Sequence, residues 1–184
     1  MNIYNMGDKY SYRWKSNFIE TLDLPLSSNI CEVSCYYGSI HPLFNLEDIG
    51  KYYIIDGGFV PDVLKEDEDV IIIDSDPSDA LDKIPDNSLD LIYFDKFYDY
   101  KDAMKFIGLG FSKVKKNGWI AGSKYSYELG RNTEVTEAIN DFARVHEQEE
   151  TGKLDTRWIR FQEKKLPVIH DGEWRIKKLI DETG

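Results

Sequence analysis

Acidic side chains recur in this sequence at the ends of short apolar runs. Glu32 lies in the first such run, Asp56 ends the second run and Asp95 ends the fourth. Continuous apolar runs of this length predict strands buried on both faces of a parallel sheet, and ligands bind beyond the carboxyl ends of such strands. Carboxylates gathered at one edge repel one another, so they favour a ligand with hydroxyls, an amine or a cation. A dinucleotide pyrophosphate would instead require a glycine-rich turn.

Five apolar runs define the predicted strands, and most are rich in β-branched and aromatic residues. They are Ile30–Cys35, Tyr52–Asp56, Val70–Asp74, Leu89–Asp95 and Gly118–Tyr125. The connections Tyr36–Lys51 and Gly57–Asp69 are short for crossovers that carry a full helix. We therefore expect one flanking helix to be reduced to a turn.

Apolar residues at helical spacing predict three helices around these strands. One spans Asp99–Lys116 and is closed by Lys115–Gly118, which supply cations and a glycine stop. Another begins at Asn132 or Thr133. Its predicted buried face consists of Val135, Ala138, Ile139, Phe142 and Val145. The third precedes the first strand and carries Trp14, Phe18, Ile19 and Leu22.

The C-terminal part alternates polar and apolar residues instead. Arg157–Gln162 and Glu173–Leu179 show this alternation, and Asp171–Gly172 provides a turn just before the second stretch. The pattern predicts an antiparallel hairpin at a sheet edge. Together, the runs predict one α/β sandwich with a mostly parallel sheet.

The composition is that of one globular domain with a strong acidic bias. The 184 residues include 34 acidic and 23 basic side chains, for a net charge of −11. The segment Asp62–Asp102 alone has a net charge of −10, whereas Lys153–Ile180 has a net charge of +4. This balance disfavours nucleic acid as a partner, and we interpret the cations near Trp158 and Trp174 as the outer face of the edge hairpin.

The sequence gives further limits on setting and chemistry. Cys31 and Cys35 would lie roughly 13 Å apart on one strand, too far for a disulfide, so we expect reduced thiols. No secretory signal or membrane span is apparent, and we expect a cytoplasmic protein. His146 and His170 lack metal-ligand spacing, and no hydrolase triad, P-loop or zinc pattern is present.

Three stretches carry a resemblance to a known superfamily. Glu32–Ser39 resembles the first motif of class I S-adenosylmethionine (SAM) dependent methyltransferases, E-[IV]-G-x-x-x-G-x-[ST]. Asp86–Tyr100 is similar to D-G-S-L-D-x-[IV]-[FY]-I-D-x-D-H-x-Y of the small-molecule and sugar O-methyltransferases in that superfamily. Val114–Tyr125 is similar to L-K-P-G-G-x-[IL]-x-G-H-D-Y of the same branch, and the resemblance covers about residues 28–145.

The resemblance implies a fold and a division of the chain. The fold would be a single Rossmann-like, three-layer α/β sandwich with a seven-stranded, mostly parallel sheet and an antiparallel C-terminal hairpin. One methyltransferase-like domain, residues 1–184, would comprise an N-terminal helix or lid (1–27), a cofactor-binding core (28–150) and the hairpin (151–184).

The resemblance also implies roles for individual residues, with SAM as the cofactor. Asp56 would accept hydrogen bonds from the ribose, Asp76 and Pro77 would lie near the adenine, and Asp95 would border the cofactor at the methyl-transfer site. The methionine part of SAM would be bordered by Glu32, Ser34, Cys35, Tyr36, Gly38 and Ser39.

Several positions depart from the family pattern. Ser34 replaces the first motif glycine, Tyr98 and Ser123 replace the two histidines, and Lys124 replaces a carboxylate. In metal-dependent relatives these carboxylates help to hold a divalent cation. An ammonium beside Asp95 disfavours such a site, so we expect no metal. Lys124 either pairs with Asp95 in place of the metal or points to solvent.

Transfer to an oxygen requires a proton acceptor within reach. The candidate catalytic residues are Asp95, Lys124 and Tyr98, with His41 as a further candidate base. Each has a plainer alternative: Asp95 caps the next helix, Tyr98 packs at its start and His41 is a loop residue.

Two functions therefore stay open. The first is an acidic, cytoplasmic transferase that methylates an oxygen of a small polar acceptor such as a sugar. The alternative is a catalytically inactive relative that keeps the fold as a binding or interaction module. A nicotinamide-dependent oxidoreductase ranks last because its glycine fingerprint is missing. A homo-oligomer is compatible with either function.

Overall fold

The structure is a computed structural model of the whole chain. It describes residues 18–20, 22–33, 40, 44, 48–55, 60, 62–95, 97–123, 133–148, 152–154 and 174–178. Among these residues, no helix is long and apolar enough to cross a membrane.

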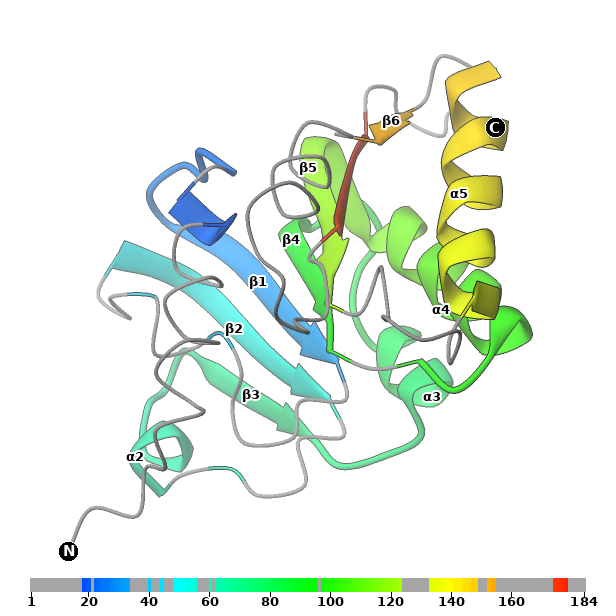
Figure 1. The fold of residues 1–184 in the computed structure, drawn as a ribbon. Coiled ribbons are helices and arrows are strands. Elements are labelled where there is room, and N and C mark those ends of the chain that lie inside the picture. The colour runs from blue at the N-terminus through cyan, green and yellow to red at the C-terminus, as the bar shows by residue number, and fades with distance from the viewer. Residues whose placement is uncertain are drawn as a thin grey trace, which may run out of the picture.

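One sheet forms the centre of the protein (Figure 1). Its strands are β1 (Ser28–Val33), β2 (Ile49–Ile55), β3 (Val70–Ile73), β4 (Leu89–Phe94), β5 (Val114–Gly122), β6 (Gly152–Leu154) and β7 (Trp174–Lys178). They lie in the order β3-β2-β1-β4-β5-β7-β6. β1 to β5 run parallel, whereas β7 is antiparallel to both β5 and β6. The predicted mostly parallel α/β sheet with an antiparallel C-terminal pair is confirmed.

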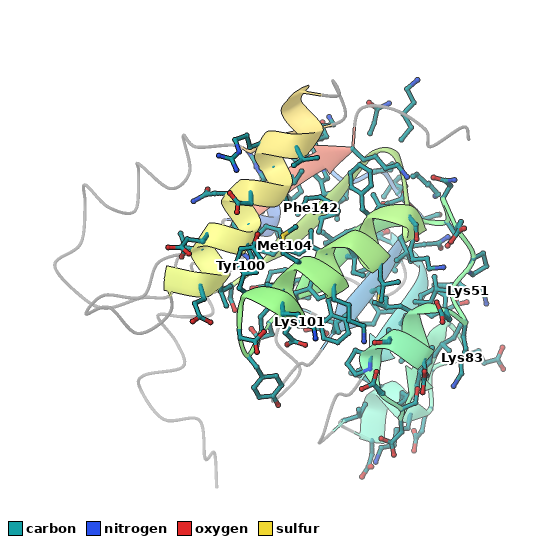
Figure 2. The ribbon with its side chains drawn as sticks, turned by 90° about the vertical axis from the view of Figure 1, so that its right-hand side faces the viewer. Lys51, Lys83, Tyr100, Lys101, Met104 and Phe142 are labelled. Carbon is teal, nitrogen blue, oxygen red and sulfur yellow. The ribbon has the colours of Figure 1, made fainter. Side chains whose placement is uncertain are left out.

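Helices on one face of the sheet bury the larger of two apolar clusters. These helices are α3 (Pro77–Leu81), α4 (Tyr100–Lys113) and α5 (Thr133–Gln148). Figure 2 shows Met104 of α4 and Phe142 of α5 where the two helices face each other. Phe142 also meets Phe111 edge to face, with ring centroids 5.5 Å apart. The second cluster lies on the opposite face and includes Phe18, Ile19 and Leu22 of the predicted N-terminal helix.

The starts of α4 and α5 agree with the predicted starts, whereas one predicted buried residue of α5 is exposed. Asp99 caps α4 by accepting the Asp102 amide hydrogen bond at 2.8 Å, close to the predicted start. α5 begins at Thr133, also as predicted. Val145, however, is 46% exposed, which corrects its assignment to the buried face. The buried stripe of α5 continues through Ala143 instead.

The end of α4 is a second correction, because Lys115–Gly118 do not close the helix. The helix ends at Lys113 and β5 follows at once, with pairing that shifts from Leu89↔Val114 to Leu91↔Trp119. Asn117 in this irregular stretch has a left-handed φ of 67°. An Asn-Gly pair after cations is a helix stop or a bulge signal, and here it is a bulge within the strand.

In the described part of the crossover between β2 and β3, the only helix is α2 (Asp62–Lys65), a single helical turn. This confirms the prediction that one flanking helix is reduced. At the C-terminus, β7 lies within the predicted Glu173–Leu179 strand, and its antiparallel partner β6 is Gly152–Leu154. The predicted partner Arg157–Gln162 lies outside the described residues.

A buried lysine ties β7 to the amino-terminal edge of the parallel strands. Lys178 is fully buried, and its Nζ donates hydrogen bonds to Asn87 Oδ1 at 2.9 Å, Phe111 O at 3.1 Å and Val114 O at 2.9 Å. Phe111 O is one of the carbonyls that the end of α4 leaves without a helical partner. The ammonium therefore joins the last strand to the α4–β5 junction and to the turn before β4.

We expect Lys178→Met to lower the free energy of unfolding by about 3 kcal/mol or more, because three acceptors lose a charged donor in a buried place. Lys116→Met is the matched control, since Lys116 is exposed and its loss should cost less than about 0.5 kcal/mol. Urea unfolding of both variants measures the difference. Equal stability of the two variants would show that Lys178 is not a structural tie.

Candidate functional site

The carboxyl ends of the five parallel strands lie at one edge of the sheet, beside α3 (Figure 1). Of the predicted site residues, Glu32 lies on β1, Asp76 and Pro77 follow β3, and Asp95 follows β4. The fold thus brings these strand ends to the edge where open parallel sheets bind ligands.

Glu32 is the most deeply buried polar group of this site. Its side chain is fully inaccessible on the central strand β1. Oε1 accepts a hydrogen bond from the Ile40 amide at 2.7 Å, and Oε2 accepts one from the Tyr52 hydroxyl at 2.6 Å. Glu32 therefore fixes the chain where it returns after the first motif and links it to β2.

Cys31 is the neighbour of Glu32 on β1, with its side chain on the opposite face. It is a fully buried free thiol. Burial, with a further contribution from the Glu32 charge, raises the pKa of Cys31 well above its usual value. A thiol in this state is neither a nucleophile nor a metal ligand.

Asp95 lies where the ends of three strands are bonded together. Its amide donates to Val33 O of β1 at 3.2 Å. The Ser123 hydroxyl after β5 contacts Asp95 O at 2.7 Å and Asp95 Oδ1 at 3.2 Å. The Ser123 amide also donates to Phe94 O at 3.0 Å. The half-buried carboxylate is thus held in place by main-chain and side-chain contacts.

An aromatic cluster backs this junction from the side of β7. Trp174 is almost fully buried and its indole nitrogen donates to Ser123 O at 3.1 Å. Phe97 lies between Phe94 and Trp174, with centroid distances of 5.2 Å and 6.2 Å. A Cβ on Gly122 would stand 2.5 Å from Phe94 O and 2.8 Å from the Trp174 ring. Only glycine at this position allows the strand ends to meet so closely.

The segment after β3 presents polar groups at the same edge. Asp76 caps α3, because its Oδ1 accepts the Ser78 amide hydrogen bond at 2.9 Å. That backbone hydrogen bond lowers the pKa of Asp76 below its usual value. Pro77 follows as the first residue of α3. The hydroxyl oxygen of Ser75 is buried and has no hydrogen-bond partner within the described part of the chain.

Tyr98 is 74% exposed, so it is not a packing aromatic at the start of α4. Its amide donates to Asp102 Oδ2 at 3.1 Å. Asp95 lies four residues before the cap of α4, and that cap is Asp99. The plainer alternatives for Tyr98 and Asp95 are therefore both wrong.

The other predicted site residues lie outside the described residues. They are Ser34, Cys35, Tyr36, Gly38, Ser39, His41, Asp56 and Lys124. His146 belongs to α5, but its side chain is not described. The pairing of Lys124 with Asp95 accordingly stays a prediction. Within the described ranges, no group of three or more His, Cys, Asp or Glu side chains could hold a metal ion.

Sequence reasoning missed three residues that shape this edge. Tyr52 and Trp174 looked like ordinary apolar members of strands, because their polar partners are distant in sequence. Ser75 follows a strand end, and that position was the one signal that could have marked it. A register between strands would have been needed to find the other two.

Comparisons by sequence give no result: no protein-family model matches the chain, and no curated protein matches it. Solved structures do match it. A protein from Clostridium thermocellum that is provisionally assigned as an rRNA methylase has 12% sequence identity and a TM-score of 0.70, and the match covers 98% of this chain and 99% of that protein.

Two further structures match with 10% identity each. Phosphoethanolamine N-methyltransferase 1 from Haemonchus contortus, in complex with phosphoethanolamine and S-adenosylhomocysteine, has a TM-score of 0.66, and the match covers 97% of this chain and 45% of that one. A provisionally assigned O-methyltransferase from Klebsiella pneumoniae has a TM-score of 0.58, with 98% and 84% covered. The chain therefore shares its fold with these solved structures.

We expect the Glu32–Tyr52 pair to behave as one unit. Glu32→Gln should lower the free energy of unfolding by about 2 kcal/mol, because hydrogen bonds to a charged acceptor are replaced by weaker bonds to a neutral amide, and Tyr52→Phe should lower it by about 1–3 kcal/mol. The double variant should lose less than the sum by about 1 kcal/mol. Urea unfolding measures the cycle, and hydrogen exchange of the Ile40 amide should accelerate in Glu32→Gln.

Tyr53→Phe is the matched control, because Tyr53 lies on the other face of β2 and packs against the larger cluster. It should leave Ile40 exchange unchanged. Strict additivity of the Glu32 and Tyr52 variants would contradict a direct bond between the two side chains.

Proposed function

We propose that the protein is a SAM-dependent methyltransferase that transfers a methyl group to an oxygen of a small polar acceptor without a metal ion. The observation that carries this proposal is the carboxyl edge of the sheet. There a buried Glu32 anchors the chain after β1, and Asp95 is held beside the end of the same strand. The fold shared with solved methyltransferases supports the reaction class.

The polar groups at this edge fit SAM as the cofactor. Ser75 offers a buried hydroxyl whose hydrogen-bonding capacity no described residue uses, and a bound nucleoside would supply the missing partner. By the resemblance, Asp56 would bind the ribose hydroxyls, and Asp76 and Pro77 would lie near the adenine. When bound, SAM supplies a methyl group that is already activated by its sulfonium.

The chain then has two tasks, to hold the acceptor and to take up its proton. Asp95 would act as the proton acceptor, because the Ser123 hydroxyl contacts its carboxylate and orients it at the end of β4. Lys124 would pair with Asp95 and supply the positive charge that a metal supplies in related enzymes. Tyr98, exposed at the same edge, would contact the acceptor. Positioning of this kind accounts for much of the catalysis of methyl transfer.

We also propose a cytoplasmic location, where the buried Cys31 would stay a free thiol. The alternative function is an inactive protein that keeps the fold as a binding module. Ser123 favours this alternative, because its hydroxyl is bonded to Asp95 where related enzymes have a histidine. Binding of SAM, followed by a screen of acceptors for turnover, distinguishes the two.

We expect calorimetric titration to show SAM and S-adenosylhomocysteine binding with dissociation constants between about 1 µM and 1 mM. The affinity should be the same with and without EDTA. Asp56→Ala should weaken binding about tenfold or more, because hydrogen bonds from hydroxyls to a charged acceptor are lost. Glu66→Ala, which removes an exposed carboxylate beyond α2, is the control and should bind normally.

Absence of binding by either ligand would refute the cofactor assignment. Binding that EDTA abolishes would refute metal independence alone. Binding without turnover on any hydroxylated acceptor would favour the inactive alternative.

Ser75→Ala tests the fit of the cofactor at a single atom. We expect weaker S-adenosylhomocysteine binding, by about three- to tenfold, and no loss of stability in the ligand-free protein. Ser112→Ala is the matched control, since its hydroxyl already donates to Leu109 O at 2.9 Å at the far end of α4. If Ser75→Ala destabilises the protein and leaves affinity unchanged, the hydroxyl has a structural role instead.

A further inference from the structure

Strand β3 forms one edge of the sheet and has an unusual environment for such an apolar strand. It consists of Val70, Ile71, Ile72 and Ile73, and none of the four is fully buried. Ile72 is 38% exposed. Among the described residues, no strand lies beyond β3 in the sheet. An apolar edge of this kind is a template for pairing with another chain.

The pairing register shows which backbone groups of β3 point outward. Tyr52 N donates to Asp69 O at 2.9 Å, and Tyr52 and Ile54 lie opposite Val70 and Ile72. In a parallel ladder, residues bond alternately to one side and the other. Ile71 and Ile73 therefore bond to β2, whereas the N–H and C=O groups of Ile72 point away from the sheet.

The short crossover explains why the side chain of Ile72 is exposed on one face of this last strand. In a sheet covered by full-length helices, the connection between β2 and β3 would cover that face of β3. Among the described residues, this connection contains only the four residues of α2, and the buried Leu64 of α2 packs into the second apolar cluster. Figure 1 shows α2 near the amino-terminal end of β3, away from most of its length.

The segment of the chain that contains β3 is strongly negative in its sequence. Residues 62–82 include nine carboxylates and one lysine, a net charge of −8, and that lysine, Lys65, is paired with Asp62 at 2.9 Å. Carboxylates precede the strand at Asp67 and Asp69 and follow it at Asp74. A strand that adds here must therefore bring positive charge.

We propose that β3 is a docking edge to which a basic, extended segment of another protein adds as a further strand. Main-chain hydrogen bonds to Ile72 provide the pairing, and the flanking carboxylates select a strand that carries Lys or Arg. A second copy of this chain is the wrong partner, because edge-to-edge pairing would bring two segments of charge −8 together. The proposal is independent of the proposed methyl transfer.

The test uses fluorescently labelled decapeptides that alternate valine with lysine or valine with glutamate. We expect the valine–lysine peptide to bind the full-length protein, and the valine–glutamate peptide not to bind. Binding should weaken as salt rises from about 0.05 to 0.5 M. Ile72→Pro removes the outward N–H without removing a bond to β2, so it should weaken binding at least about tenfold. Ile72→Val, which keeps that N–H, should bind as the unmodified protein does.

A second arm avoids any change to the protein. Methylation of alternate backbone nitrogens in the valine–lysine peptide blocks one of its pairing edges, and affinity should fall by a similar factor. No binding of the unmodified peptide at about 1 mM would overturn the proposal, as would equal binding of the methylated peptide. Dimerisation of the protein that Ile72→Pro abolishes would also overturn it, since the edge would then take a second copy.

Discussion

The buried carboxylate of Glu32 is the constraint on which the carboxyl edge of this protein depends. A charge on the central strand of a sheet is tolerated only where donors replace the lost water. Here the donors are the Ile40 amide and the Tyr52 hydroxyl. Because one comes from the chain after β1 and the other from β2, satisfying the carboxylate fixes both. The positions of Ile40 and Tyr52 relative to β1 thus depend on one buried group.

The amino-terminal edge of the sheet is held together by its own set of polar contacts. At the amino-terminal edge, polar side chains connect neighbouring strands: Asp90 accepts the Asn29 amide hydrogen bond and pairs with Lys115, both at 2.8 Å. Lys178 closes the end of α4 at the same edge. These contacts join neighbouring strands at the amino-terminal edge, as the bonds of Asp95 and Ser123 do at the carboxyl edge.

The sequence predicted the parts of the fold that local patterns determine. The five parallel strands, the start of α4 and the shortened crossover follow from apolar runs, an Asp cap and chain length. The predicted end of α4 was wrong because Asn117–Gly118 is a valid signal for both a helix stop and a strand bulge. Only the pairing of β4 with β5 decides between the two. Tyr52 could not be assigned to the site, because its bond to Glu32 spans 20 residues. Such contacts are fixed by strand register, which a single sequence does not state.

Both connections of β3 contain little helix, and each has its own effect. The connection after β3 contains only α3, and Asp76 is positioned as the cap of this helix. Among the described residues, the connection before β3 contains only α2, and the side chain of Ile72 is left 38% exposed. The carboxylates around β3 prevent this exposed edge from pairing with copies of the same acidic chain. The acidity of residues 62–82 thus limits which partners the exposed edge of β3 can take.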